Sequence, residues 1–382
     1  MAEGGVKLAL VVPGGVDRSG EVRVIPALVC LVERIARTHE VHVFALHQEP
    51  SAGKWQLAGA TVHNIGEGWT QMRAIAAIRS EHRRAPFDLI QAIFSGPCGS
   101  IAVVAAKLLR RPVAVHVAGV ELIALHDIGC GGRRTWKGRL RENWVLHRAD
   151  AVTAASAPMI DALRAMGVAA QRVPLGVDLK KWPPLAPRER RQVPARLIHV
   201  ASLNRVKDQA TLLRALAAVA GTGLDFRMDI VGFDTLGGEM QRLAQTLGLE
   251  QRVRFHGFKT QSELRPMMES AALLVMSSRH EAGPMVVLEA AVAGVPTVGT
   301  AVGHIAEWAP SAALAVPVGN PARLANAICL VLSNEDCRLY LARAAQGRAL
   351  LEDADCTARA FESLHQQLVR IRNESAAATL VH

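Results

Sequence analysis

The sequence predicts an α/β protein made of two Rossmann-like, doubly wound domains. Its 382 residues are more than one ordinary core accommodates and suit two domains of about 180 residues each. Half of the residues are hydrophobic and 20% are charged, so the chain has enough apolar sequence for buried parallel sheets. Short apolar runs alternate with amphipathic segments, a pattern typical of successive strand and helix units.

Changes in composition along the chain predict the domain boundaries. We expect an N-terminal domain over residues 1–180, a linker rich in proline and arginine over 181–195, and a C-terminal domain over 196–355. A last helix over 356–372 and a flexible tail over 373–382 complete the predicted order, because chain ends without apolar periodicity commonly fray.

The first domain opens with an apolar strand at 6–12, and Pro13, Gly14 and Gly15 then turn the chain toward a helix over about 23–38. A strand, a glycine loop and a helix in this order form the geometry that can cradle a phosphate. A later strand, 113–117, carries His116 near its carboxyl end. The other elements expected in this domain are strands at 41–46, 61–65 and 89–93, and helices at 71–83 and 99–109.

The formal net charge of +10 is concentrated in the first half of the chain. Residues 1–180 hold 22 Lys and Arg against 15 Asp and Glu, whereas residues 181–382 hold 22 against 19. This excess predicts an anionic partner for the first domain, either a phosphorylated acceptor or an acidic membrane surface. Nucleic acid is not expected, because aromatic residues make up only 4% of the chain and leave little for base stacking.

A basic segment at 131–148 carries Trp136, Leu140 and Trp144, which share one face if the segment is a helix. One interpretation is a stripe that packs on the core, with a solvated basic side. The alternative is an interfacial helix that contacts anionic lipid, with its aromatic rings at the headgroup level.

The second domain opens with a strand at 196–201, a polar loop that ends in Lys207, and a helix at 209–220. A lysine at the start of a helix that follows a strand can neutralise a diphosphate. Another strand and loop carries Glu281, and the apolar helix that follows carries Glu289. A carboxylate in so apolar a helix is costly to bury without a hydrogen-bond partner, and a vicinal diol supplies two donors. The alternative is that Glu289 reaches solvent and Glu281 is an ordinary loop acid.

Glu281 and Glu289 are spaced as Glu-x7-Glu, and Ala-Ala-Val-Ala-Gly-Val-Pro and then Gly303 follow. This arrangement resembles the signature of the family 4 glycosyltransferases, retaining enzymes with the glycosyltransferase B (GT-B) fold, in which two Rossmann-like domains face each other across a cleft. The resemblance implies that Glu289 binds the nucleotide ribose and that Glu281 contacts hydroxyls of the donor sugar. It also implies that backbone amides near Gly283 and Met285 hold sugar and phosphate.

Lys207 matches a lysine that binds the donor phosphates in this family. The family also has an arginine just after the strand, and Ser202 occupies that position in this chain. Arg205 is the nearest substitute, and together Lys207 and Arg205 would stabilise charge on the departing diphosphate. The family glycine three residues after the first glutamate is Pro284 in this chain. Since proline has no N–H to donate, that family contact is missing.

The resemblance extends to four further positions. His116 corresponds to a histidine that lines the donor sugar, and the Gly14-Gly15 loop corresponds to a cleft loop near the donor phosphates and the acceptor. Gly257 and Phe258 lie where relatives pack beside the nucleobase, although Phe258 can equally be a core residue. The last helix, 356–372, corresponds to one that crosses back to the first domain and couples both termini to cleft closure, and the first domain corresponds to the acceptor side.

The resulting expectation is a retaining transferase that moves a hexose from a UDP- or GDP-sugar to an acceptor hydroxyl. The acceptor is unknown, with anionic and lipid-linked molecules both open. The alternatives are a sugar-nucleotide epimerase of the same fold and a non-catalytic sugar-nucleotide or glycan-binding relative. No cofactor beyond the nucleotide sugar is expected. No metal is expected either, and we expect Asp353 and Asp355 to be solvent-exposed despite their metal-like spacing.

Cysteine usage and the N-terminal residues predict a cytoplasmic protein. The six cysteines are scattered without a Cys-x-x-Cys pair, as is typical of reduced structural cysteines. Met1 to Gly5 do not show the basic and then apolar pattern of a secretory signal. If the basic first domain binds lipid, the protein would lie at the inner face of the membrane.

Overall fold

The computed structural model describes residues 5–190 and 193–380, which form two compact units. Unit 1 contains the chain up to Leu175 together with the segment from Ala354 onward, and unit 2 contains Gly176–Asp353. The first boundary lies before the predicted residue 180 because Gly176 and Val177 pack within unit 2. A Cβ atom on Gly176 would lie 2.2 Å from the Asp353 carbonyl carbon, and Val177 is buried in a core cluster of that unit.

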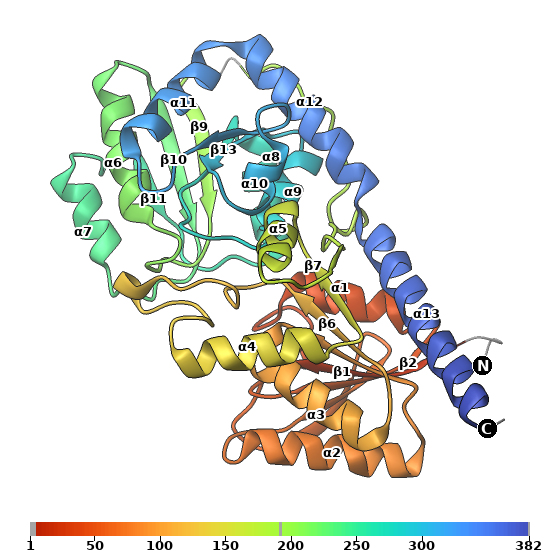
Figure 1. Cartoon of the computed structure of the whole chain (residues 1–382). Coiled ribbons are helices and arrows are strands. Elements are labelled where there is room, and N and C mark those ends of the chain that lie inside the picture. The colour runs from red at the N-terminus through yellow and green to blue at the C-terminus, as the bar shows by residue number, and fades with distance from the viewer. Residues whose placement is uncertain (1–4, 191–192, 381–382) are drawn as a thin grey trace. The chain divides into compact units, whose positions relative to one another are not determined.

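Unit 1 is built on an eight-stranded sheet, drawn in red to yellow in Figure 1. Its strands are β1 (Lys7–Val12), β2 (Glu40–Ala45), β3 (Gly53–Leu57), β4 (Ala60–Asn64), β5 (Leu89–Ile93), β6 (Val113–Val117), β7 (Ala151–Ala154) and β8 (Gln171–Arg172). Their spatial order is β3-β4-β2-β1-β5-β6-β7-β8, and every pair is parallel except β3 with β4. The winding reverses between β1 and β5, so the segments that leave these two strands diverge there.

The helices of unit 1 cover both faces of this sheet, as expected for parallel strands that are apolar throughout. They are α1 (Pro26–Ile35), α2 (Thr70–Arg84), α3 (Ser100–Leu109), α4 (Trp136–Arg148), α5 (Ala157–Ala165) and α13 (Ala354–Leu380), with the short turns η1 (Ser95–Gly99) and η2 (His126–Ile128). The last helix joins the core of this unit through Phe361, Leu364 and Leu368. It is anchored to α1 by Arg34, whose Nε lies 2.5 Å from an oxygen of Asp355.

Unit 2 is built on a six-stranded parallel sheet. Its strands are β9 (Ala195–Val200), β10 (Phe226–Val231), β11 (Val253–Phe255), β12 (Leu273–Met276), β13 (Thr297–Thr300) and β14 (Leu314–Val316). The order β11-β10-β9-β12-β13-β14 is that of the doubly wound dinucleotide-binding fold, with its winding reversal between β9 and β12. The sheets of the two units confirm the predicted doubly wound α/β architecture.

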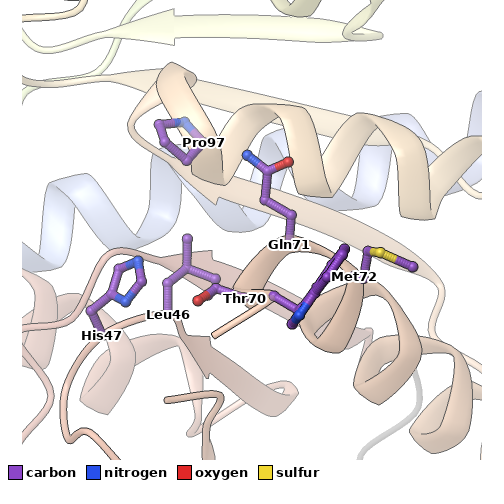
Figure 2. A pocket seen from close by; sticks show the side chains of 7 residues that line it. Leu46, His47, Thr70, Gln71, Met72 and Pro97 are labelled. Atoms are coloured by element: carbon purple, nitrogen blue, oxygen red, sulfur yellow. The ribbon is translucent and has the colours of Figure 1, made fainter. Parts of the chain in front are cut away.

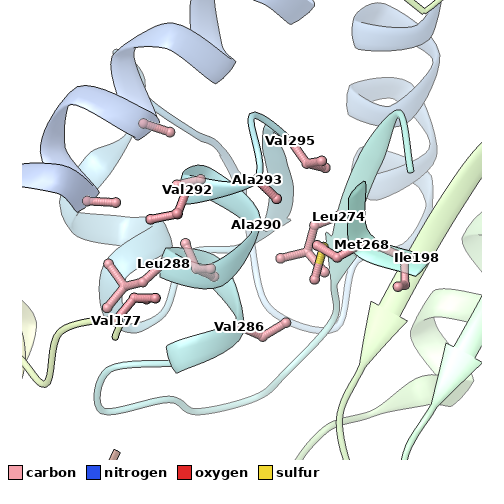
Figure 3. Close-up of a cluster of buried hydrophobic side chains, with 14 of the residues drawn as sticks. Val177, Ile198, Met268, Leu274, Val286, Leu288, Ala290, Val292, Ala293 and Val295 are labelled. Atoms are coloured by element: carbon pink, nitrogen blue, oxygen red, sulfur yellow. The ribbon is translucent and has the colours of Figure 1, made fainter. Parts of the chain in front are cut away.

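The helices of unit 2 are α6 (Gln209–Gly221), α7 (Glu239–Thr246), α8 (Gln261–Ser270), α9 (Met285–Val292), α10 (Gly303–Trp308), α11 (Pro321–Ser333) and α12 (Glu335–Leu351). Helix α9 is apolar on nearly every side and lies inside a buried cluster. Figure 3 shows its Leu288, Ala290 and Val292 among Val177 and Val295, which come from the segments around it. The surrounding apolar residues fix this helix firmly, and a charged residue within it needs a specific partner.

Two features of the elements were not predicted. Strand β3 was not expected, although Ala58 and Gly59 take the positive φ angles, 51° and 81°, of a tight hairpin turn. Helix α13 continues to Leu380, so the predicted tail from residue 373 is helical up to there, and 381–382 lie outside the described residues. No helix in the described part of the chain combines the length and the apolar content that spanning a bilayer requires.

Candidate active site

The centre of the candidate site is the winding reversal of unit 2, between β9 and β12. These strands are paired in parallel. In doubly wound sheets the helices that follow two such strands run to opposite faces, and ligands bind at the carboxyl ends of the strands. The segment after β9 carries Lys207, and the segment after β12 carries Glu281. The fold therefore brings together two of the predicted site residues that lie far apart in the sequence.

Lys207 and Glu281 form an ion pair with 2.6 Å between Nζ and Oε1. The Ser278 hydroxyl donates to the same carboxylate oxygen over 2.7 Å. The lysine side chain is 26% exposed and the glutamate side chain 9% exposed, so the pair is shielded but open on the lysine side.

The backbone around Lys207 is held by several hydrogen bonds. Asn204 Oδ1 accepts the N–H groups of Val206 and Lys207, both at 3.0 Å, which is a tight turn built on a side chain. The Ser277 hydroxyl donates to the Lys207 carbonyl over 2.8 Å and so ties the two loops together. Asp208 then caps α6 by accepting from the Thr211 N–H. The lysine is consequently presented from a fixed backbone.

Glu289 lies on α9 and is only 6% exposed, which excludes the alternative that its carboxylate reaches solvent. Its Oε1 accepts a hydrogen bond of 3.0 Å from Gln261 at the start of α8. Burial raises the pKa of Glu289 to about 7, and the Gln261 hydrogen bond only partly offsets this effect. A buried carboxylate of this kind is ready to accept hydroxyl donors from a ligand that displaces the Gln261 amide.

The amino end of α9 lies directly after the Glu281 segment. Pro284 is the N-cap residue, and the amides of Gly283 and Met285 come before the first hydrogen bond that the helix can make internally. Gly303 packs against this segment, where an added Cβ would lie 2.8 Å from Pro284 Cδ and where its φ is +49°. Only glycine fits that approach without moving the segment.

Arg205 takes a different direction from Lys207. Its guanidinium makes two hydrogen bonds, of 2.8 and 2.7 Å, to the Glu239 carboxylate on α7. Both side chains are exposed, so this is a surface ion pair of the kind that contributes little to stability. In this structure Arg205 is therefore paired with Glu239. To take the place of the family arginine that is absent at Ser202, it would have to bind the donor phosphates instead.

Gly257 and Phe258 lie in the irregular segment between β11 and α8. Gly257 has φ +68°, and its carbonyl accepts the Gly232 N–H over 2.9 Å. Phe258 is 55% exposed, so the alternative that it is a core residue is wrong. An exposed aromatic ring here is available to a flat ligand.

In unit 1, the Gly14-Gly15 loop is filled from within the protein. Gln48 Oε1 accepts the N–H groups of Gly15 and Val16 over 2.7 and 2.9 Å. Gly15 has φ +80°, and a Cβ there would lie 2.5 Å from Ile25 Cγ1. The loop therefore has the shape expected of a phosphate cradle, but two of its amides bind a glutamine side chain. Nothing in the sequence pattern points to Gln48.

His116 has no exposed surface. Its Nδ1 lies 2.9 Å from the Thr153 hydroxyl, and its ring meets Phe361 of α13 edge-on with 5.3 Å between centroids. Burial lowers the pKa of His116 to about 3, so the ring is neutral. Because α13 covers this face of the sheet, His116 offers a ligand no surface, and we assign it no contact with a donor sugar.

A buried carboxylate pair lies near the ends of β5 and β6. Glu121 accepts the backbone N–H groups of Gly119 and Ser95, and burial raises its pKa to about 7. Glu142 on α4 accepts the Ser95 hydroxyl over 2.6 Å and pairs with Arg141. The pair fixes the turns that follow the two strands.

A pocket of about 470 Å³ opens on unit 1 between the end of β2, the start of α2 and the turn η1. Figure 2 shows the Gln71 side chain extending from α2 toward the segment that holds Pro97. Trp69 is 81% exposed, in the left-handed conformation just before α2. The lining residues are Leu46, His47, Trp69, Thr70, Gln71, Met72 and Pro97.

Helix α4 buries the side that holds Gly138, Glu142 and Val145. Trp136, Leu140 and Trp144 therefore lie on the outer side, where they are 61%, 59% and 38% exposed. The interpretation of these three residues as a core stripe is wrong. The cations Lys137 and Lys107 lie over the rings of Trp136 and Trp144, at 5.6 and 5.8 Å from the ring centroids.

Family models match most of the chain. Residues 25–176 match the glycosyl transferase 4-like domain, and residues 186–348 match the glycosyl transferases group 1 model. The chain is 30% identical over 292 residues to 2-deoxystreptamine glucosyltransferase of Streptomyces kanamyceticus, covering 71% of this chain and 74% of that protein. It is 29% identical over 239 residues to a glycogen synthase of Mycobacterium tuberculosis, where the match covers 61% of this chain and 57% of the relative.

Solved structures share the fold at low identity. Sucrose-phosphate synthase of Thermosynechococcus elongatus superposes with a TM-score of 0.78 at 19% identity, covering 96% of this chain and all of that one. Anabaena HepE in complex with UDP-glucose gives 0.70 at 18% identity, covering 96% of this chain and 99% of that one. These neighbours are GT-B proteins. With this fold, and with its family matches in both units, the chain belongs to the group 1, or family 4-type, glycosyltransferases.

Proposed function

We propose that this glycosyltransferase moves a hexose from a nucleotide diphosphate sugar to an acceptor hydroxyl with retention of anomeric configuration. The observation that carries the proposal is the Lys207–Glu281 pair at the winding reversal of unit 2, with Glu289 buried on the adjoining helix. The cation suits the diphosphate of such a donor, and the two carboxylates suit the hydroxyls of its sugar and its ribose.

In this proposal Lys207 leaves Glu281 when the donor enters and neutralises the diphosphate. Its partial exposure allows this movement, and its braced backbone limits the disorder that would follow. The amides at the amino end of α9 add partial positive charge. Stabilisation of the departing diphosphate lowers the barrier directly, because negative charge develops there as the sugar bond breaks.

The two carboxylates bind the rest of the donor. Freed from Lys207, Glu281 remains bound to the Ser278 hydroxyl and accepts hydroxyls of the sugar. Glu289 exchanges the Gln261 amide for the ribose diol, and Phe258 lies exposed for the base. UDP-sugars are the first donors to test, since the neighbouring HepE structure holds UDP-glucose. Because Lys207 and the amides supply the positive charge, we propose that the reaction needs no metal ion.

The acceptor binds unit 1 in this proposal. The pocket beside Trp69 lies at the carboxyl end of the sheet, where ligands of such folds bind. An exposed tryptophan offers an apolar face to a sugar ring, and the Thr70 and Gln71 side chains offer hydrogen bonds. These properties suit a glycan or glycoside acceptor.

We propose that α4 holds the protein at an anionic membrane. Its exposed Trp136 and Leu140 lie among lysines and arginines, a combination that binds the headgroup region of anionic bilayers. The test is sedimentation with vesicles of phosphatidylglycerol and phosphatidylcholine. We expect binding that falls with salt and is lost when Trp136 and Leu140 are replaced by Ser. Equal recovery of wild type and variant with the vesicles would refute this membrane role.

The donor is tested by thermal shift with UDP-, GDP-, ADP- and dTDP-sugars. We expect the sugars of one nucleotide to raise the melting temperature of the wild type. The melting temperature of the Lys207→Ala variant should rise less with the same donor. An isomerised donor in the absence of acceptor would favour the epimerase alternative. Donor binding without turnover for any glycoside acceptor would favour the non-catalytic alternative. No response to any donor would contradict the donor site.

A further inference from the structure

Two histidines and a glutamate form a cluster on unit 1 and are not among the residues of the site described above. His42 lies on β2, His63 on the neighbouring β4, and Glu81 near the end of α2. One ring nitrogen of each histidine and one carboxylate oxygen lie within 4.8 Å of one another. The parallel register pairs His63 with Phe44, two residues beyond His42, so both imidazoles are on the same face of the sheet.

The two histidines share one proton, which lies between a ring nitrogen of His42 and a ring nitrogen of His63. His42 Nδ1 and His63 Nε2 are 3.0 Å apart, and His42 Nε2 is 3.0 Å from a carboxylate oxygen of Glu40. Because a carboxylate accepts, His42 carries its proton on Nε2 and directs the Nδ1 lone pair at His63. A carboxylate behind a histidine is the usual support of a metal-binding imidazole, since it fixes the tautomer and raises the basicity of the ring.

The rings are also fixed by packing. His63 stacks on Phe44 with 4.7 Å between centroids, and Phe87 meets His42 edge-on at 5.4 Å. These contacts hold the two imidazoles side by side on the sheet.

Glu81 is not tightly bound by its neighbouring cations. The side-chain nitrogens of Arg84 and Lys54 are 3.6 and 3.9 Å from its oxygen, longer than hydrogen bonds. The arginine side chain is 71% exposed and the lysine side chain 52% exposed, whereas Glu81 is 13% exposed. Both cations can swing into solvent and leave the carboxylate to a ligand.

We propose that His42, His63 and Glu81 bind a divalent transition-metal ion of the zinc type, which clamps β2, β4 and α2 together. Two imidazoles and one carboxylate are a ligand set that zinc prefers, with water as a fourth ligand. Bonds of about 2.0–2.1 Å in a tetrahedral site place two nitrogens about 3.3 Å apart, so the observed 3.0 Å needs only a small opening. On binding, His63 transfers its proton from Nε2 to Nδ1, so the ion takes the place of the shared proton.

The experiment uses the full chain, treated with chelator and then dialysed. Zinc sulfate is titrated by calorimetry, and cobalt chloride is titrated by visible absorption, which reports the ligand geometry. We expect about one equivalent of zinc to bind, the melting temperature to rise by several degrees, and a cobalt spectrum typical of nitrogen and oxygen ligands. His147→Ala, which removes an exposed histidine on α4, serves as the control and should bind like the wild type.

Three variants identify the ligands. Glu81→Gln and His63→Ala should each weaken zinc binding at least tenfold, while Lys54→Ala should strengthen it by removing a competing cation. Glu81→Gln keeps the shape of the side chain and Lys54→Ala changes an exposed residue, so the test does not depend on one variant that fails to fold. Zinc affinity that is unchanged in both Glu81→Gln and Lys54→Ala, or the absence of zinc binding by the wild type, would overturn the proposal.

Discussion

Replacing Glu289 by glutamine should make unit 2 more stable at pH 8. The change keeps the shape of the side chain and removes a charge that is buried in an apolar helix. In the folded protein the pKa of Glu289 is about 7, against 4.5 for the ordinary carboxyl group. This difference of about 2.5 corresponds to about 3 kcal/mol, at about 1.4 kcal/mol per pKa unit.

The sign follows from the protonation states. Below pH 4.5 the carboxyl group is neutral in both folded and unfolded chains, and its burial carries no electrostatic cost. Between pH 4.5 and 7 the unfolded chain loses its proton first, so the wild type loses stability as pH rises. Glutamine does not titrate. Over this range the free energy of unfolding of Glu289→Gln should therefore rise by up to about 3 kcal/mol relative to that of the wild type.

The assay is urea unfolding of wild type and Glu289→Gln at pH 5, 6, 7 and 8. Glu250→Gln, which changes an exposed carboxylate in the same unit, is the matched control and should follow the wild type at every pH. Donor titration of the same proteins tests the function. Loss of the charge-assisted bonds to ribose should weaken donor binding by about 1.5–3 kcal/mol. A constant difference in stability between wild type and Glu289→Gln from pH 5 to 8 would refute the desolvation argument.

Three further predictions concern other parts of the account. Gly303→Ala should lower the free energy of unfolding by about 1–2 kcal/mol, because φ +49° is strained for a residue with a side chain. It should also weaken donor binding, because the new Cβ pushes on Pro284. The control is Gly319→Ala, which has φ +69° but open space around it and should show the strain alone. Equal donor affinity in both variants would contradict the packing argument. Trp69→Ala should raise the KM for the acceptor about tenfold at unchanged donor affinity, which corresponds to roughly 1.4 kcal/mol for one aromatic contact. Trp69→Phe should restore most of the acceptor binding. An unaffected KM would exclude this pocket as the acceptor site. EDTA should leave nucleotide release unchanged if Lys207 supplies the positive charge, and a rate that recovers only on addition of magnesium would contradict this.

The architecture of unit 2 follows from its sequence because each strand is a short apolar run that ends in a polar loop. The positions of Glu281 and Glu289 follow for the same reason, since a loop after a parallel strand and the first turns of the next helix meet at one edge of the sheet. Their partners do not follow. Gln261 is 28 residues from Glu289, and nothing in local sequence marks it as the donor to that carboxylate.

The errors in unit 1 have one physical cause, which is that periodicity gives shared faces without saying what covers them. Trp136, Leu140 and Trp144 do lie on one face of α4, but the opposite face packs inward because Gly138 allows close approach to the Gly132 carbonyl. His116 lies near the end of a central strand as predicted, but α13 returns from the far end of the chain and covers it with Phe361. Such long-range packing has no signal in local sequence.

The most direct test of the proposed mechanism is nucleotide release from the preferred donor by wild type, Lys207→Ala and Arg205→Ala. Lys207 forms its ion pair with Glu281 at the candidate site, whereas Arg205 is bound to Glu239 at the surface. We predict a rate at least about 100-fold lower for Lys207→Ala and a rate close to that of the wild type for Arg205→Ala. A near wild-type rate for Lys207→Ala would contradict the proposal that this lysine stabilises the departing diphosphate.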